Sequence, residues 1–298
     1  MVTIHEQYPK LAATLGLADI YFKREDLHPY GSHKGRSIPV MIDYYRQKSE
    51  RRFAISSSGN AALAAALHVQ KLNASDDARA ALEDALDLQI FVGQKARPFK
   101  IDRLRALTDE HIHLTVKERP LQALMEAEHA GSRSLRQSTD DIALVGYASL
   151  AEEISRIDAC GAIFMAASSG TTAQALARYF AGTAAASRVQ IHIVQTSSCH
   201  PIADAFETFD GHEELSAADA IVDRTAHRKD ALVPLIQKSG GHGWFASNEQ
   251  IGSAQKLVRA HTGLDISPNS ALSVVGAMQA AYRGWPIKGA AVCIIGGE

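Results

Sequence analysis

The feature that most constrains the fold of this chain is the regular alternation of short apolar runs with longer segments of helical periodicity. Eight runs are rich in β-branched or apolar residues and have the length of strands, whereas most of the intervening segments have helical spacing. This order predicts an α/β fold in which helices cover a mostly parallel sheet. The predicted strands are Ile20–Lys23, Arg52–Ile55, Leu88–Val92, Ile112–Val116, Ala162–Ala167, Val189–Gln195, Gly243–Ala246 and Ala290–Ile295.

Three of the intervening segments carry further helix signals. Asn60–Leu72 is rich in Ala and Leu, and Pro98–Leu107 opens with a proline that suits a first helical turn. Ser247 and Gln250 have the spacing of a capping box. The segment Asn73–Asp87 is rich in Ala and Asp, and we expect it to be a surface insert without a chemical role.

The charge balance of the chain excludes several classes of partner. Its 298 residues include 31 Lys and Arg against 33 Asp and Glu, a formal net charge of -2. Such a chain has no overall positive field for a nucleic-acid backbone or an anionic membrane, so we expect neither partner. It shows no run of about 18 uncharged apolar residues and no amino-terminal secretory pattern. We therefore expect a cytoplasmic protein in which Cys160, Cys199 and Cys293 are reduced thiols.

The segment from Lys23 to Arg36 mixes charged residues with the turn formers Pro29 and Gly31, and it contains Lys34. Turn chemistry alone makes it a solvated loop. Two junctions between predicted strands and predicted helices give the segment a second interpretation, because both have the composition of an anion site.

The first junction, Ser56–Asn60, follows one predicted strand and opens a predicted helix. Its small residues let a ligand approach the backbone, while the first amide groups of the helix point at an anion. A carboxylate would fit there. A serine run that only caps the helix would explain the same residues.

The second junction, Ser168–Thr172, offers hydroxyls, a glycine and unpaired amides after the apolar run Ala162–Met165. It lacks the spaced glycines of the dinucleotide fingerprint and the Gly-Lys-Ser/Thr ending of a P-loop, so a single phosphate is the better match. A lysine ahead of two such helix starts suggests a phosphate cofactor that bears an aldehyde and is joined to Lys34. A carboxylate substrate would then bind at the first junction.

Taken together, these landmarks resemble those of the fold-type-II pyridoxal-phosphate enzymes, the tryptophan-synthase β-like group. The resemblance covers nearly the whole chain in the expected order, and it is closest to threonine synthases and threonine dehydratases. It rests on Glu25–Leu27 with Gly31–Arg36, Ser57–Asn60, Ser169–Thr171, Val194–Ile202 and Ile266–Ala271.

The resemblance implies two three-layer α/β domains with mostly parallel sheets and the cofactor in the interdomain cleft. Residues 1–38 and 146–298 would form the large cofactor-binding domain, and residues 39–145 the small substrate domain. The implied cofactor is pyridoxal 5'-phosphate, the implied substrate is a small amino acid, and the implied assembly is a homodimer.

The resemblance also implies residue roles. Lys34 would form the Schiff base with the cofactor and, once released, take the α-proton of the substrate. Asn60 would hydrogen-bond the pyridine 3-oxygen, and Ser32 would lie near the phosphate or the leaving group. The substrate carboxylate is assigned to Ser57, Ser58, Gly59 and Asn60, and the cofactor phosphate to Ser168, Ser169, Gly170, Thr171 and Thr172.

The implied activity is that of a pyridoxal-phosphate-dependent lyase, which eliminates or replaces a group at the β- or γ-carbon of an amino acid. Threonine-synthase-like or threonine/serine-dehydratase-like chemistry is preferred. The alternatives are a cysteine-synthase-like β-replacement enzyme and a pyridoxal-phosphate-binding homologue without turnover.

The sequence departs from the family at the end of its last predicted strand. Family members usually present a Ser or Thr to the pyridine nitrogen there, whereas this chain has Ile295 before Gly296 and Gly297. A ring nitrogen that faces a neutral hydroxyl or an apolar side chain is expected to stay unprotonated, because no carboxylate stabilises the cation, and this favours elimination over half-transamination. The carboxylate of Glu298 would reverse this prediction if it folded back onto the ring nitrogen.

Two smaller clusters suggest other chemistry. His111 and His113 alternate on a predicted strand, but no third ligand accompanies them in sequence, so no metal is predicted. Cys199 and His200 could form a thiol and base pair. Catalytic Cys and His residues usually meet across a fold rather than as sequence neighbours, so this pair is given no role.

Overall fold

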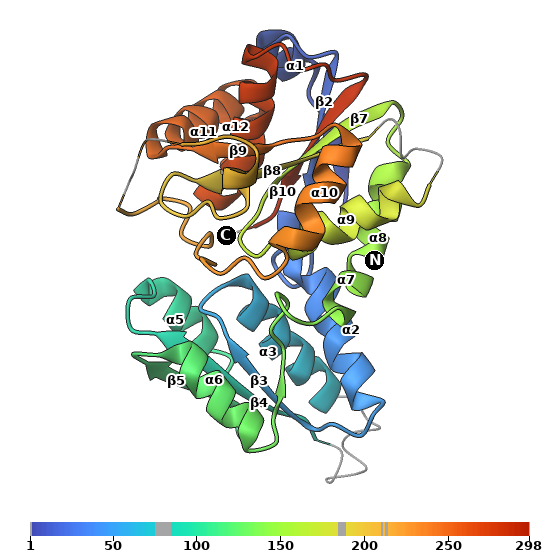
Figure 1. The fold of residues 1–298 in the computed structure, drawn as a ribbon. Helices are drawn as coiled ribbons and strands as arrows, with labels where there is room; N and C mark the ends of the chain where they lie inside the picture. Colours follow the sequence, from blue (N-terminus) through green and yellow to red (C-terminus); the bar gives the residue numbers. More distant parts are fainter. Residues whose placement is uncertain (1, 75–84, 184–188, 210, 212–213, 298) are drawn as a thin grey trace. The chain divides into compact units, whose positions relative to one another are not determined.

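The computed structural model describes residues 2–74, 85–183, 189–209, 211 and 214–297. The chain divides into two compact units, the first made of Met1–His28 with Tyr147–Glu298 and the second of Pro29–Gly146. Residues 29–38, which the sequence division assigned to the large domain, group with the second unit. Lys34 therefore lies in the second unit (Figure 1).

The first unit contains a six-stranded sheet with the order β1-β2-β10-β7-β8-β9. β1 pairs with β2 in antiparallel fashion, and every other neighbouring pair is parallel. Parallel strands end at one edge of a sheet, so the segments that follow β7, β8, β9 and β10 emerge on the same side. The strands are β1 (His5–Gln7), β2 (Asp19–Arg24), β7 (Cys160–Ala166), β8 (Gln190–Thr196), β9 (Gly243–Ala246) and β10 (Ala290–Ile295).

Helices cover both faces of this sheet, which gives the unit three layers (Figure 1). One face carries α12, which contacts β7 to β10 and packs against α11 and α1. The other face carries α9 and α10, and α8 packs on α9. These helices are α1 (Pro9–Leu15), α8 (Ala148–Ser155), α9 (Thr171–Ala181), α10 (Lys229–Ser239), α11 (Asn248–Thr262) and α12 (Pro268–Tyr282).

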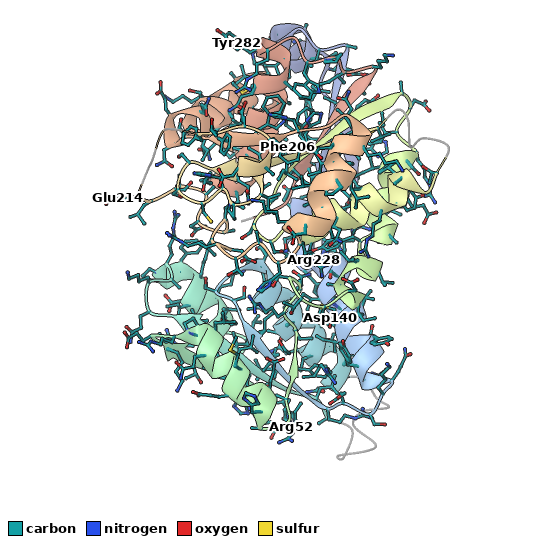
Figure 2. All side chains as sticks on the ribbon, viewed as in Figure 1. Arg52, Asp140, Phe206, Glu214, Arg228 and Tyr282 are labelled. Atoms are coloured by element: carbon teal, nitrogen blue, oxygen red, sulfur yellow. The ribbon has the colours of Figure 1, made fainter. Side chains whose placement is uncertain are left out.

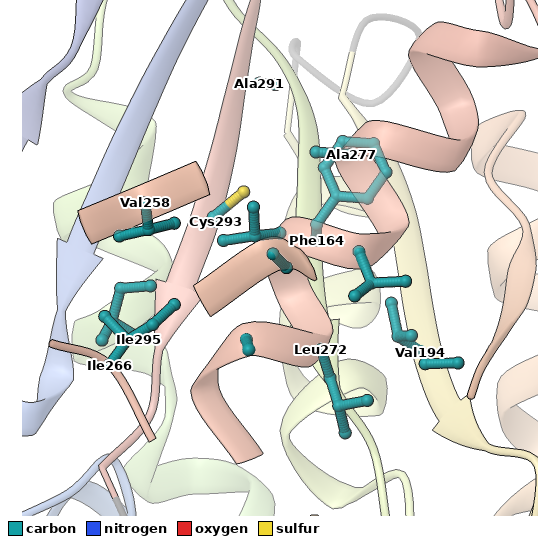
Figure 3. Close-up of a cluster of buried hydrophobic side chains, with 14 of the residues drawn as sticks. Phe164, Val194, Val258, Ile266, Leu272, Ala277, Ala291, Cys293 and Ile295 are labelled. Atoms are coloured by element: carbon teal, nitrogen blue, oxygen red, sulfur yellow. The ribbon is translucent and has the colours of Figure 1, made fainter. Parts of the chain in front are cut away.

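The main core of the first unit lies between the sheet and α12 (Figure 3). Successive strand residues point to opposite faces, so the buried Phe164 and Val194 face α12. Cys293 and Ile295 of β10 join them, together with Leu272 of α12. This continuous apolar layer holds the carboxyl ends of the strands in fixed positions.

The second unit contains a four-stranded, all-parallel sheet with the order β5-β4-β3-β6. α6 packs on the sheet over β3, β4 and β5, while α3 contacts β4 and packs against α2 and α5. The elements are α2 (Lys34–Arg46), β3 (Arg52–Ser56), α3 (Asn60–Asn73), β4 (Asp87–Gly93), α5 (Pro98–Arg105), β5 (Ile112–Lys117), α6 (Pro120–His129), β6 (Arg133–Ser134) and α7 (Ile142–Gly146).

The predicted fold class is confirmed, since both sheets are mostly parallel and all eight predicted strands are present. The predicted capping box is also confirmed: the Gln250 amide donates to Ser247 Oγ, and the Ser247 amide donates to Gln250 Oε1. Most of the predicted insert Asn73–Asp87 lies outside the described residues. Among the described residues, no helix combines the length and apolarity that crossing a bilayer requires.

Candidate active site

Lys34 is the first residue of α2, directly after a buried turn. Its backbone amide donates to Ser32 Oγ at 3.2 Å, and Ser32 is fully buried. Within the described part of the chain, the half-buried Lys34 ammonium makes no hydrogen bond or ion pair. A lysine on a rigid turn with an uncommitted amine is suited to covalent chemistry with a carbonyl group.

A polar chain fixes the backbone just before this turn. Asp43 Oδ1 lies 3.1 Å from His68 Nε2, and the Tyr30 hydroxyl lies 2.9 Å from His68 Nδ1. A carboxylate only accepts, so Nε2 donates to Asp43, and the Tyr30 hydroxyl forms the hydrogen bond at Nδ1. Burial, followed by the charge of Asp43, raises the pKa of Tyr30, so its hydroxyl stays a donor. Tyr30 thereby ties the lysine turn to α2 and α3.

The serine junction follows β3, and α3 begins at Asn60 with Gly59 as its N-cap. No side chain caps the helix, since Ser57 Oγ accepts only from the Gly59 amide, at 3.3 Å. The alternative that the serine run serves as a helix cap is therefore wrong. Among the described residues, the side chains of Ser58 and Asn60 have no hydrogen-bond partner, which leaves them able to bind a ligand.

The lysine turn and the serine junction are neighbours within the second unit. Gly31 has a φ of +74°, and a Cβ built there would lie 3.4 Å from Leu63 Cδ2, in the first turn of α3. The same Cβ would lie 3.1 Å from Arg103 Nη2 of α5. The turn is therefore packed between α3 and α5, which places two predicted parts of the site on one rigid body.

The predicted phosphate loop follows β7 in the first unit. Gly170, with a φ of +81°, is the N-cap of α9, and no side chain caps the helix. Ser169 Oγ and Thr171 Oγ1 are 2.9 Å apart. Ser168 Oγ accepts from the amides of Val222 and Asp223, both at 3.1 Å, so its own proton remains to be donated.

Gln195, fully buried on β8, holds the start of this loop. Its Nε2 donates to the Ala167 carbonyl at 3.0 Å, while its Oε1 accepts from the Ile202 and Ala203 amides. Gln195 belongs to Val194–Ile202, one of the segments that carry the family resemblance, but the resemblance implies no role for it. Its position shows that it joins the end of β7 to the turn after β8 and so fixes the loop.

Arg228, the N-cap of α10, was not identified from the sequence (Figure 2). Its Nε donates to Thr171 Oγ1 at 3.1 Å, and its Nη1 donates to Gln174 Oε1 at 2.8 Å. The residue is only 5% exposed. The amides at the start of α9 and the hydroxyls of the loop form a donor set whose chemistry fits a phosphate group, and the Arg228 guanidinium binds one of these hydroxyls.

Ile295 ends β10 and is 1% exposed within the apolar core of the first unit, near Ile266 (Figure 3). The polypeptide beyond it is held by α12, because the hydroxyls of Ser267 and Ser270 donate to the Gly297 carbonyl at 2.7 and 3.1 Å. Glu298 lies outside the described residues. The strand position that the family fills with a hydroxyl is therefore apolar in this chain.

The smaller clusters have structural partners. His200 Nδ1 contacts Asp204 Oδ1 at 2.6 Å, and burial raises the pKa of Cys199, which disfavours a reactive thiolate. His111 Nδ1 contacts Asp87 Oδ1 at 2.9 Å. No group of three or more His, Cys, Asp or Glu side chains suited to a metal ion occurs among the described residues.

A family model described as "Pyridoxal-phosphate dependent enzyme" matches residues 2–297. A search of curated proteins returned no match.

Solved structures share the fold at low sequence identity. A pyridoxal 5'-phosphate-dependent aspartate racemase superposes with a TM-score of 0.80 at 19% identity, covering 100% of this chain and 90% of that one. Threonine deaminase isoform 2 from Solanum lycopersicum gives 0.78 at 22%, covering 99% and 83%. A fungal L-serine ammonia-lyase from Rhizomucor miehei gives 0.78 at 15%, covering 100% and 94%. These likenesses establish a common fold.

Proposed function

The chain belongs to the family of pyridoxal-phosphate dependent enzymes, and from that premise we propose that it is a lyase that acts on a small hydroxy amino acid. The reaction would be elimination or replacement at the β- or γ-carbon, with threonine or serine chemistry preferred. The observation that carries the proposal is the half-buried Lys34, whose amine has no partner among the described residues, on a turn whose Gly31 packs against Leu63 of α3. The serine junction that opens α3 has Ser58 and Asn60 side chains that are available to a ligand.

Two sets of residues would hold the cofactor. In the second unit, Lys34 would bind its aldehyde carbon and Asn60 its 3-oxygen. In the first unit, Ser168, Ser169, Gly170, Thr171 and Thr172 would hold its phosphate through hydroxyls and helix amides. When bound, pyridoxal phosphate supplies an electron sink for the charge left at the substrate α-carbon.

The remaining chemistry belongs to the chain's own residues. Ser57, Ser58, Gly59 and Asn60 would bind the substrate carboxylate at the amino-terminal end of α3, where backbone amides favour an anion. Lys34 Nζ, released when the substrate amine takes its place, would accept the α-proton. The turn fixed by Tyr30 and Ser32 would keep that amine in reach of the α-carbon.

The apolar end of β10 supports elimination. With Ile295 at the end of β10, that residue provides no carboxylate to stabilise a protonated ring nitrogen, and its apolar surroundings disfavour the charge. Reactions that expel a good leaving group need a shorter-lived carbanion than racemisation or transamination does. We therefore propose that release of a keto acid dominates over half-transamination.

The test is a panel of amino acids that includes serine, threonine and their O-acylated or O-phosphorylated forms. Keto-acid release would be followed by a coupled dehydrogenase, and chiral chromatography would record racemisation. A parallel series with sulfide present would detect a cysteine-synthase-like replacement. Lys34→Ala is the control for every reaction. The lyase assignment fails if no member of the panel turns over while the cofactor is bound, which would support a homologue without turnover.

The anchor is tested separately. Borohydride reduction followed by peptide mapping should place the fixed cofactor on Lys34, and Lys34→Ala should lose the adduct. An adduct that persists in the variant would show that another lysine is the anchor.

We also propose that the protein is a cytoplasmic homodimer. Cys160, Cys199 and Cys293 are free thiols, as in a reducing compartment. Closed two-fold dimers are the commonest assembly of soluble enzymes. Light scattering coupled to size-exclusion chromatography measures the mass directly, and a monomer mass would contradict the assembly.

A further inference from the structure

The predicted phosphate loop lies where two helices begin rather than one. α9 starts after Gly170 and α10 starts after Arg228, and a Cβ built on Gly170 would lie 3.9 Å from Arg228 Cβ. Neither N-cap residue closes its helix with a side-chain hydrogen bond. Each helix amino terminus carries roughly half a positive charge, so the two ends add at one place.

The contact between these helix starts depends on glycine. At Gly170 the φ of +81° disfavours any side chain, and a Cβ would lie 2.7 Å from Leu232 Cδ2 and 3.0 Å from Ile202 Cδ1. Both neighbours are fully buried. The first turns of α9 and α10 are therefore pressed together by apolar packing, and Arg228 is carried to the loop with them.

A buried guanidinium is added to this positive region. Arg228 contacts Thr171 and Gln174, which lie in the first turn of α9. A cation at the amino-terminal end of a helix has the unfavourable sign for the helix dipole. The two helix ends and this guanidinium place positive charge at one loop, and an anion bound there would interact favourably with it.

Arg228 also holds the hydroxyl pair of the loop in place. Its Nε donates to Thr171 Oγ1 at 3.1 Å, and Thr171 Oγ1 lies 2.9 Å from Ser169 Oγ. The guanidinium thereby fixes the position of the Thr171 hydroxyl, and that hydroxyl in turn fixes the Ser169 hydroxyl beside it.

We propose that Arg228 is a positioning residue for the cofactor phosphate: it fixes the positions of the Thr171 and Ser169 hydroxyls and adds positive charge at the loop that would bind the dianion. The inference rests on the proposed function, because it takes the phosphate at Ser168–Thr172 to be that of the cofactor. It adds a residue outside the loop to those that would hold the phosphate.

The first experiment compares two ligands that differ only in the phosphate. Dissociation constants of pyridoxal phosphate and pyridoxal are measured for wild type, Arg228→Gln and Arg228→Lys by absorbance titration. Hydrogen bonds to charged groups are worth enough that Arg228→Gln should weaken pyridoxal phosphate roughly 10- to 100-fold. Pyridoxal affinity should change less than about 3-fold, because pyridoxal has no phosphate to interact with Arg228. Arg228→Lys keeps the charge and should fall between the two.

Arg178→Gln is the matched control, because Arg178 is exposed in the last turn of α9 and its loss removes the same charge from the opposite helix end. Its ligand affinities should equal those of wild type. Equal weakening of both ligands in Arg228→Gln would mean that Arg228 only supports the fold, and unchanged affinity for pyridoxal phosphate would exclude a role altogether.

A second measurement needs no variant and covers the case in which Arg228→Gln does not fold. Free phosphate monoesters titrate near pH 6, and the positive region should keep the bound phosphate of wild type dianionic well below that pH. The ³¹P chemical shift of the bound cofactor should therefore stay constant from pH 8 to about 5, whereas free cofactor titrates near 6. A bound phosphate that titrates like the free one would overturn the inference. Failure to bind either ligand in wild type would instead overturn the proposed function.

Discussion

His192 is a neutral histidine enclosed in the core of the first unit. Its burial leads to a specific prediction about how the free energy of unfolding depends on pH. The residue is fully buried and stacks on Phe164 with ring centroids 4.4 Å apart. Trp244 Nε1 donates to its Nδ1 at 3.1 Å, and its Nε2 lies 3.1 Å from Gln190 Oε1. An indole only donates, so Nδ1 is the acceptor and Nε2 carries the proton.

Protonation of His192 would place a charge in an apolar layer. It would also make Nδ1 a donor, which would then face the N–H group of Trp244. Burial, followed by repulsion from His242, lowers the pKa of His192 from 6.5 to about 3. Between these two values the unfolded chain binds a proton that the native state does not, so the free energy of unfolding falls as the pH falls. With these pKa values the loss between pH 7 and pH 5 is about 2 kcal/mol.

The assay is urea unfolding followed by tryptophan fluorescence at pH 7, 6 and 5. Both tryptophans of the chain, Trp244 and Trp285, lie in the first unit, so the signal reports that unit. His192→Asn keeps an acceptor for the indole and removes the titrating group. Its absolute stability will be lower, but its loss between pH 7 and pH 5 should be about 2 kcal/mol smaller than that of wild type.

His5→Asn is the control, because His5 is exposed on β1 of the same unit. Its pH dependence should match that of wild type. His242 adds to the wild-type slope, since burial lowers its pKa as well, and this contribution cancels in the comparison. Equal slopes for wild type and His192→Asn would refute the assignment of a neutral, buried His192.

The remaining predictions concern the candidate site and the close packing around it. Thr171→Val should weaken cofactor retention, whereas Ser58→Ala should leave the cofactor bound and raise KM for the amino acid; equilibrium dialysis and steady-state kinetics separate them, and equal cofactor loss in both would contradict the assignment. Ile295→Asp would place a carboxylate at the end of β10 that favours a protonated ring, so it should shift the product ratio from keto acid toward the inverted amino acid, measured by chiral chromatography, and an unchanged ratio would remove the role given to the apolar strand end. Gly161→Ala should cost roughly 1–3 kcal/mol in urea unfolding, because its Cβ would lie 2.4 Å from the Lys288 carbonyl oxygen, and an unchanged midpoint would show that the backbone yields freely.

The strands were predictable because burial on both faces leaves a strong local signal. Parallel strands covered by helices read as short continuous apolar runs, and each of the eight predicted runs forms one. β1 and β6 were missed because the first is polar and the second has two residues, so neither has an apolar pattern of its own. β1 is a strand because it pairs with β2, and β6 is a strand because it pairs with β3.

The sequence also indicated which two loops have the composition of an anion site. Gly170 marks a helix start that needs a left-handed residue, and the small residues of Ser57–Asn60 mark a backbone that a ligand can approach. What the sequence left open was whether a serine capped α3. The structure decides this through the position of Gly59 as N-cap, which depends on how β3 ends and not on composition.

Arg228 shows why part of the site could not be found from the sequence. It lies in a charged segment that begins near Asp223, which has the composition of a solvated surface turn, far along the chain from Thr171. Inside the fold, Asp223 Oδ1 accepts from the Thr225 amide and shapes that turn, and the apolar contact of Leu232 with Gly170 brings the start of α10 against α9. A cation that looks exposed in sequence is thus buried by the packing of a neighbouring helix. The donor to Thr171 therefore comes from a distant segment, and nothing in the loop's own sequence indicates it.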